Sequence, residues 1–184
     1  MVETQVTSHL YFTKSAAALY EHEGASSRPT KLSSGLTISE SRRLVDLVIE
    51  RGPIKDLVQV PIPSPPPPWF SGVVRSLNRC LSLPEDWDSY GARRVDPEIA
   101  ASALIFLLTR LAGLIPIAPS VCPINSGGAQ FEWHTNGIDL EIAFVSPIEF
   151  EVYFNDGKIE KEWKQDDREP LDRLYELIGS LTQD

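Results

Sequence analysis

Strict alternation of apolar and polar residues between positions 127 and 163 constrains this chain most. Strand side chains repeat every two residues, so the pattern predicts an antiparallel sheet with one apolar and one polar face. The predicted apolar face holds Ala129, Phe131, Trp133, Ile138, Leu140, Ile142, Phe144, Ile148, Phe150, Val152 and Phe154. The predicted outer face holds Gln130, Glu132, His134, Asp139, Glu141, Ala143, Glu149, Glu151 and Tyr153. The segment therefore predicts a β-meander whose outer face is acidic.

Turn residues support the meander independently of the alternation. Asn136-Gly137 is a strong hairpin signal, because a type I′ turn needs positive φ at both central residues. Ser146-Pro147 and Asn155-Asp156-Gly157 mark the next two connections. Residues 158–163 are then a weaker fourth strand, and residues 120–124 are an edge strand, where flanking prolines are tolerated.

The net charge of −9 is unevenly distributed. Residues 1–75 hold eight Lys/Arg against seven Asp/Glu, so the remainder carries −10. From Val95 to Asp156 the only basic residue is Arg110, against eight acids. Such a sheet repels phosphate, which argues against direct nucleic-acid binding there and favours a basic protein partner.

The N-terminal half carries weaker signals. Residues 1–38 are expected to form a loosely attached arm with strand-type residues at 10–13, or an arm that orders on a partner. Residues 39–52 predict a helix capped by Ser39, with Leu44, Leu47, Val48 and Arg51 along one side. The proline run at 61–68 predicts a stiff extended spacer, with an SH3-type ligand as the alternative.

Three helices are expected in the second half, at residues 71–83, 96–111 and 169–181. Asp96-Pro97-Glu98 is a well-formed helix start, with aspartate as the N-cap. The fold class is therefore α+β: an antiparallel meander of four to five strands packed on helices, preceded by a helical and extended arm. The proline run divides the chain into residues 1–68, an arm with helix and Pro-rich connection, and residues 69–184, the α+β core domain.

Cysteine use and hydropathy favour a cytoplasmic protein. Cys80 and Cys122 do not make a disulfide framework and are expected to be buried, reduced thiols. The first residues show no signal-peptide pattern. The apolar stretch 99–117 is interrupted by Arg110, glycine and proline, so it predicts a buried helix and no membrane association.

One group of residues suggests chemistry. If these side chains shared one cleft, their carboxylates, phenol and imidazole could support general acid/base hydrolysis or hold a divalent metal. The residues are Glu85, Asp86, Asp88, Tyr90, Glu132 and His134. The three histidines lack metal-ligand spacing, and no nucleophile elbow, P-loop or dinucleotide fingerprint is present. Loop capping by Asp86 and Asp88, and a surface position for His134, are the simpler interpretations. We therefore assign no catalytic residue, metal or cofactor.

Of the tryptophans, Trp133 is expected in the core. Trp69 directly follows the prolines and is expected to be exposed for contact, since indole suits binding hot spots.

Two motifs carry a resemblance over residues 83–157. The sequence Trp87-Asp88-Ser89-Tyr90-Gly91-Ala92 and the strand Gly127-Gly128-Ala129-Gln130-Phe131-Glu132-Trp133 resemble a group of small uncharacterised bacterial proteins with a W-D-x-Y-G-A element and a G-G-x-x-x-E-W strand. The resemblance implies a bacterial setting and an α+β fold, and it implies no catalytic residues. It also implies that Trp87 and Tyr90 pack a loop against the helix and sheet, with Gly91 permitting a sharp exit.

These signals favour a non-enzymatic protein-binding module, such as an antitoxin, an immunity protein or an inhibitor or accessory subunit of a bacterial or phage defence system. The residues expected to bind a basic protein partner are Glu132, His134, Asp139, Glu141, Glu149, Glu151 and Trp69. Three alternatives remain: a merely solvated acidic face, a homo-oligomer formed through an edge strand, and a metal-dependent hydrolase or nuclease that uses Asp86, Asp88, Glu132 and His134.

Overall fold

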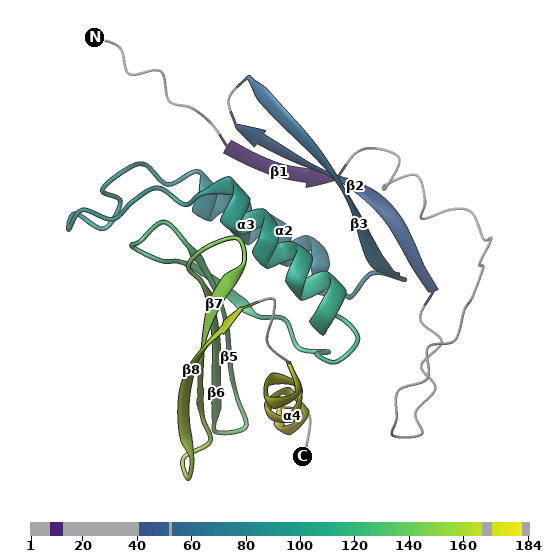
Figure 1. The fold of residues 1–184 in the computed structure, drawn as a ribbon, viewed down its shortest axis with the longest axis vertical. Helices are drawn as coiled ribbons and strands as arrows, with labels where there is room; N and C mark the ends of the chain where they lie inside the picture. Colours follow the sequence, from purple (N-terminus) through teal and green to yellow (C-terminus); the bar gives the residue numbers. More distant parts are fainter. Residues whose placement is uncertain (1–7, 13–40, 52, 167–170, 182–184) are drawn as a thin grey trace.

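The computed structural model describes residues 8–12, 41–51, 53–166 and 171–181. They form two antiparallel sheets and a set of helices, so the α+β class and the meander are confirmed (Figure 1). One sheet has the order β1-β2-β3 and the other the order β4-β5-β6-β7-β8.

The five-stranded sheet follows the predicted meander closely. Its strands are β4 (Ser120–Pro123), β5 (Ala129–Thr135), β6 (Ile138–Phe144), β7 (Glu149–Asn155) and β8 (Glu160–Asp166). Burial alternates along β5 to β7 as expected, and β4 lies at the edge.

The hairpin turns also match their sequences, with one correction. Asn136 and Gly137 have φ of 53° and 74°, as a type I′ turn requires. Ile148, however, was wrongly predicted on the apolar face, because its side chain is 62% exposed. The hydroxyl of Ser146 accepts hydrogen bonds from the backbone amides of Ile148 and Glu149, which holds Ile148 in the turn before β7 begins.

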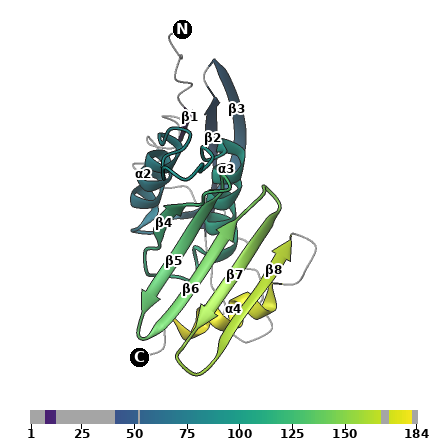
Figure 2. The same cartoon turned by 90° about the vertical axis from the view of Figure 1, so that its left-hand side faces the viewer.

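Helices cover the apolar face of this sheet (Figures 1 and 2). They are α3 (Pro97–Phe106), its continuation as a π-helical turn η2 (Leu107–Leu111), and α4 (Asp172–Ser180), whereas α2 (Phe70–Leu81) packs against the edge strand β4 and against β1. The side chain of Asp96 accepts a hydrogen bond from the amide of Glu98 (2.7 Å), which confirms the predicted N-cap of α3. Within the part of the chain that is described, no helix has the length and apolarity of a membrane span.

The predicted helix at 39–52 is wrong: Ser41–Arg51 is strand β2, and it pairs along its full length with β3 (Ile54–Ser64). The apolar residues of β2 fit a helical stripe, but Leu47 and Ile49 also alternate correctly for a strand. Both are buried, together with Val60 and Ile62 of β3. Pairing with a second β-type run after a short turn decided the outcome, and a single-segment pattern does not contain that information. Ser39 itself lies outside the described residues.

The predicted proline spacer is wrong for the part that β3 contains. Pro61 and Pro63 pair with Leu44 and Arg42 of β2. β3 is an edge strand, where a residue without an amide hydrogen costs little if its nitrogen faces away from the partner strand. The backbone at Pro61 and Pro63 is therefore extended, as predicted, but it forms a sheet strand and not a spacer.

Part of the supposed loose arm is fixed in the core. Strand β1 (Ser8–Phe12) pairs with β2, and Leu10 is fully buried. The side chain of Asn78 on α2 binds both the amide and the carbonyl of Leu10, each at 2.7 Å. The rest of the predicted arm lies outside the described residues. Buried residues from both sides of position 68 form one hydrophobic cluster, and the domain division at that position stays a prediction.

Candidate functional site: the acidic face of the sheet

The outward side chains of β5 to β8 form one surface, in front of which no described helix or strand lies in Figure 2. We call it the acidic face. Strand register places residues from neighbouring strands directly opposite each other, so that Glu132 faces Glu141 and Tyr153 faces Glu162. The carboxylates of the acidic face are Glu132, Asp139, Glu141, Glu149, Glu151, Glu160 and Glu162.

Glu132 and Glu141 form a like-charge pair at the centre of the face. Directly opposed carboxylates repel each other across strands. The amide nitrogen Nε2 of Gln130 donates to Oε1 of Glu132 (3.0 Å) and to Oε2 of Glu141 (2.8 Å). One neutral amide therefore bridges two acids, and the net charge of the pair is not reduced.

His134 lies between two acids at the end of the face. Its Nδ1 is 2.8 Å from Oδ1 of Asp139, and its Nε2 is 3.4 Å from Oε2 of Glu132. The hydrogen bond to Asp139, and to a smaller extent that to Glu132, raises the pKa of His134 above its ordinary value of 6.5. The imidazolium form therefore persists to higher pH than in a free histidine.

Lys164 neutralises one of the predicted binding acids. Its Nζ is 2.8 Å from Oε1 of Glu151. This hydrogen bond to Glu151 is the largest of the effects that raise the pKa of Lys164. At the outward positions of β5 to β8, Lys164 and His134 are the basic side chains, so the acids outnumber the bases on this surface.

The sulfur of Cys122 borders this face. Burial first, and then the nearby carboxylate of Glu132, raises the pKa of Cys122 to about 11. Cys80 is buried and Cys122 is half-buried, and both are free thiols. A thiol held so far from ionisation is a poor nucleophile at neutral pH.

Trp69 does not lie on the acidic face, and its predicted exposure is wrong. Its side chain is only 5% exposed, and its indole Nε1 donates to the carbonyl of Ile115 (3.0 Å). The ring fills space between the start of α2 and the chain after η2, where its single donor finds a partner.

The loop acids serve the loop itself. Oδ1 of Asp86 accepts from the amide of Gly91 (2.6 Å), and Oδ1 of Asp88 accepts from those of Tyr90 (2.8 Å) and Ala92 (3.0 Å). Among the described residues, no group of three or more His, Cys, Asp or Glu is placed to hold a metal.

The end of this loop has the conformation that the sequence predicted at Gly91. Gly91 has φ of 90°, which allows the chain to turn sharply as it leaves the loop. Tyr90, which was expected to pack, is 93% exposed.

Sequence reasoning missed three members of the site. Gln130 was seen only as an outward residue, because its bridging role depends on strand register. Glu160 and Glu162 were missed because residues 158–163 gave a weak strand pattern; the same alternation, extended to Lys164, would have placed them on the outer face.

Comparisons with protein-family models, with curated proteins and with solved structures find no match to this chain.

Proposed function

We propose that this chain is a non-enzymatic protein-binding module whose acidic face binds a basic protein partner. The observation that supports the proposal most strongly is the pair Glu132 and Glu141. Their carboxylates are held side by side by the neutral amide of Gln130, and among the described residues neither is paired with a lysine or arginine, although Nε2 of His134 lies 3.4 Å from Glu132. Opposed like charges cost stability, so a fold that retains them at its centre gains if a partner supplies the missing positive charge.

The geometry of that pair favours arginine or lysine on the partner. A guanidinium presents several N–H donors in a planar fork and can bind two carboxylates at once. Nucleic acid is disfavoured, because its phosphates would meet a surface of the same sign.

This surface would suit an antitoxin, an immunity protein or an inhibitor subunit in a bacterial or phage defence system, acting in the cytoplasm. Toxins and nucleases that act on nucleic acid need basic surfaces, and an acidic face can cover such a surface. The bacterial setting comes from the resemblance over residues 83–157, which stays a prediction.

Metal-dependent hydrolysis through Asp86, Asp88, Glu132 and His134 is supported less well. The first two carboxylates are engaged by the amides of their own loop, and His134 is engaged by Asp139.

A matched pair of charge-swap variants tests the proposal. A partner that co-purifies with the tagged chain from its host is itself purified, and its affinity is measured at low and high salt. E132K/E141K should weaken binding more than about tenfold at low salt, since two close charge contacts are reversed. The control D172K/E176K makes the same change in net charge at exposed positions of α4 and should change affinity only slightly. Equal loss in both variants, or no loss in E132K/E141K, would remove the proposal.

A further inference from the structure

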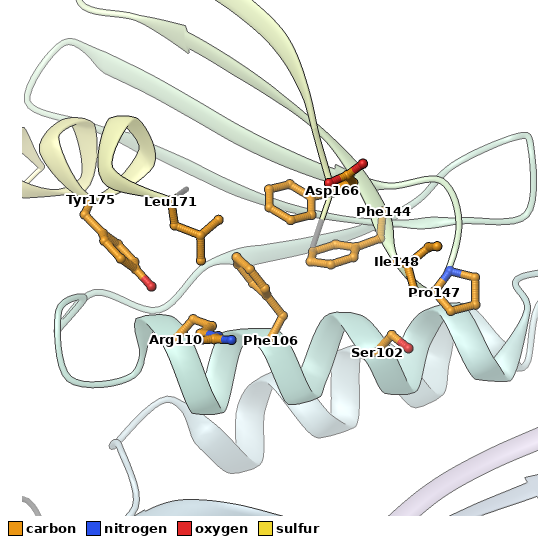
Figure 3. Close-up of a pocket in the computed structure, with 10 residues that line it drawn as sticks. Ser102, Phe106, Arg110, Phe144, Pro147, Ile148, Asp166, Leu171 and Tyr175 are labelled. Carbon is orange, nitrogen blue, oxygen red and sulfur yellow. The ribbon is translucent and has the colours of Figure 1, made fainter. Parts of the chain in front are cut away.

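A second, separate site lies on the opposite side of the sheet from the acidic face. A groove of about 390 Å³ opens between α3 with η2, the ends of β6 to β8, and α4 (Figure 3). That volume is within the range of small-molecule sites. At about 30 Å³ per water molecule, it accommodates about a dozen non-hydrogen atoms.

The wall of the groove is aromatic and rigid. The ring of Phe106 on α3 lies 5.4 Å from that of Phe144 and 4.7 Å from that of Phe150, centroid to centroid. Phe144 and Phe150 belong to the buried core, whereas Phe106 is only partly buried. The groove therefore offers a preformed apolar surface to a hydrocarbon group.

One end of the groove carries the positive charge of Arg110. Arg110 is exposed, and within the described part of the chain no carboxylate lies at ion-pair distance from its guanidinium. It belongs to the π-helical turn η2, and such turns occur frequently at functional sites. In Figure 3 its side chain, Phe106 and Ser102 follow one face of the helix along the groove.

Tyr175 adds a hydrogen-bond donor at the same end. It enters from α4, and Figure 3 shows its hydroxyl directed towards the side of the groove that holds Arg110. Burial, more than any other effect, raises the pKa of Tyr175 above its ordinary value of 10, so the hydroxyl keeps its proton at neutral pH.

Asp166 lies at the rim of the groove, apart from Arg110 and Tyr175 (Figure 3). In the strand register it is opposite Glu149, which belongs to the acidic face. The groove thus combines an apolar body with hydrogen-bond donors at one end.

From this geometry we propose that the groove binds a small amphipathic monocarboxylate, with its carboxylate on Arg110 and Tyr175 and its hydrocarbon part against Phe106. The inference does not depend on the acidic face or on its partner. A single negative charge on the ligand is matched by Arg110, which has no ion-pair partner among the described residues and is the only Lys or Arg between Val95 and Asp156.

Calorimetric titration of the full chain with 4-phenylbutyrate and its neutral counterpart 4-phenylbutan-1-ol tests this assignment. The two probes share a hydrocarbon part that fits the groove, and they differ in the charge that Arg110 would bind. The acid should bind at least about tenfold more tightly than the alcohol, as expected for a hydrogen-bonded ion pair. Equal affinities for the two probes would overturn the proposal. So would the absence of binding by either probe at concentrations up to about 10 mM.

Substitutions then locate the site. R110Q should abolish the preference for the acid and leave the affinity for the alcohol unchanged, while R75Q removes an exposed arginine on α2 and should change neither. S102W should block both probes by filling the groove. Chemical shift changes at the Tyr175 ring on adding 4-phenylbutyrate give a readout that needs no variant. A preference for the acid that survives in R110Q, or shifts confined to other aromatic residues, would contradict the assignment.

Discussion

The two sheets differ in how their acidic side chains are paired. In the three-stranded sheet, Arg51 pairs with Asp56 and with Glu98 of α3, and Lys55 pairs with Glu50 at 2.8 Å. In the five-stranded sheet, Glu132 and Glu141 face each other with only a neutral amide between them. The Arg51–Glu98 pair links the β2–β3 hairpin to α3, whereas the opposed acids Glu132 and Glu141 are paired with no lysine or arginine of the described residues. This difference is the reason why we propose the five-stranded sheet, and not the three-stranded sheet, as the docking surface.

Although their surfaces differ, the two sheets share a core, and core truncations should show this with the largest effect. Leu47 of β2 is fully buried and Phe131 of β5 is 1% exposed. L47A and F131A should each lower the free energy of unfolding by about 2–5 kcal/mol. Thermal unfolding followed by circular dichroism should give a single shifted transition in both variants. Two separate transitions would show that the sheets unfold independently.

The attachment of β1 should depend on one side chain of α2. N78A leaves the amide and carbonyl of Leu10 without their side-chain partner, which should cost about 1–3 kcal/mol. The neighbouring exposed residue provides the control, and R79A should cost much less. Denaturant unfolding measures both. Equal losses in N78A and R79A would mean that Asn78 does not secure β1.

On the acidic face, removing a charge should stabilise the fold. E141Q relieves repulsion from Glu132 and keeps an oxygen that can accept from Gln130, so stability should rise by about 0.2–1 kcal/mol. E151Q loses the ion pair with Lys164 and should bring no such gain. Denaturant midpoints compare the two variants. A loss of stability in E141Q would show that the opposed acids are not in conflict.

The smallest expected effect is the pH response of His134. Because its pKa is raised in the folded state, its contribution to stability is full below pH 6.5 and is lost as pH rises through the folded-state pKa. The side chain is 51% exposed, so this contribution is at most a few tenths of a kcal/mol. NMR titration of the imidazole should show a pKa above 6.5, which D139N lowers more than E132Q does. An unchanged pKa in D139N would contradict the assigned hydrogen bond.

The same comparison explains what could be read from the sequence. Between residues 127 and 163 the alternation is strict and the turns are local, so strands, faces and the Asn136-Gly137 turn follow from short-range rules. In β2, apolar residues fall on both faces, as Val48 beside Leu47 and Ile49 shows. Such a run fits a helical stripe as well as a strand, and only pairing with β3 decides between them.

The sites were predictable to different degrees. The outward acids of β5 to β7 follow from the alternation, but the bridge made by Gln130 requires strand register. Trp69 was misplaced because its partner, the carbonyl of Ile115, is distant in sequence. Arg110 and Tyr175 line one groove from two separate helical segments, and no spacing in the sequence predicts that they share a site.

The central claim is that the outer face of the second sheet is the docking surface. Amide hydrogen exchange on the complex with the purified partner tests it most directly. The account predicts protection concentrated on β5 to β8, reduced at high salt and absent with E132K/E141K. Protection confined to β2 and β3, with β5 to β8 exchanging as in the free chain, would contradict it.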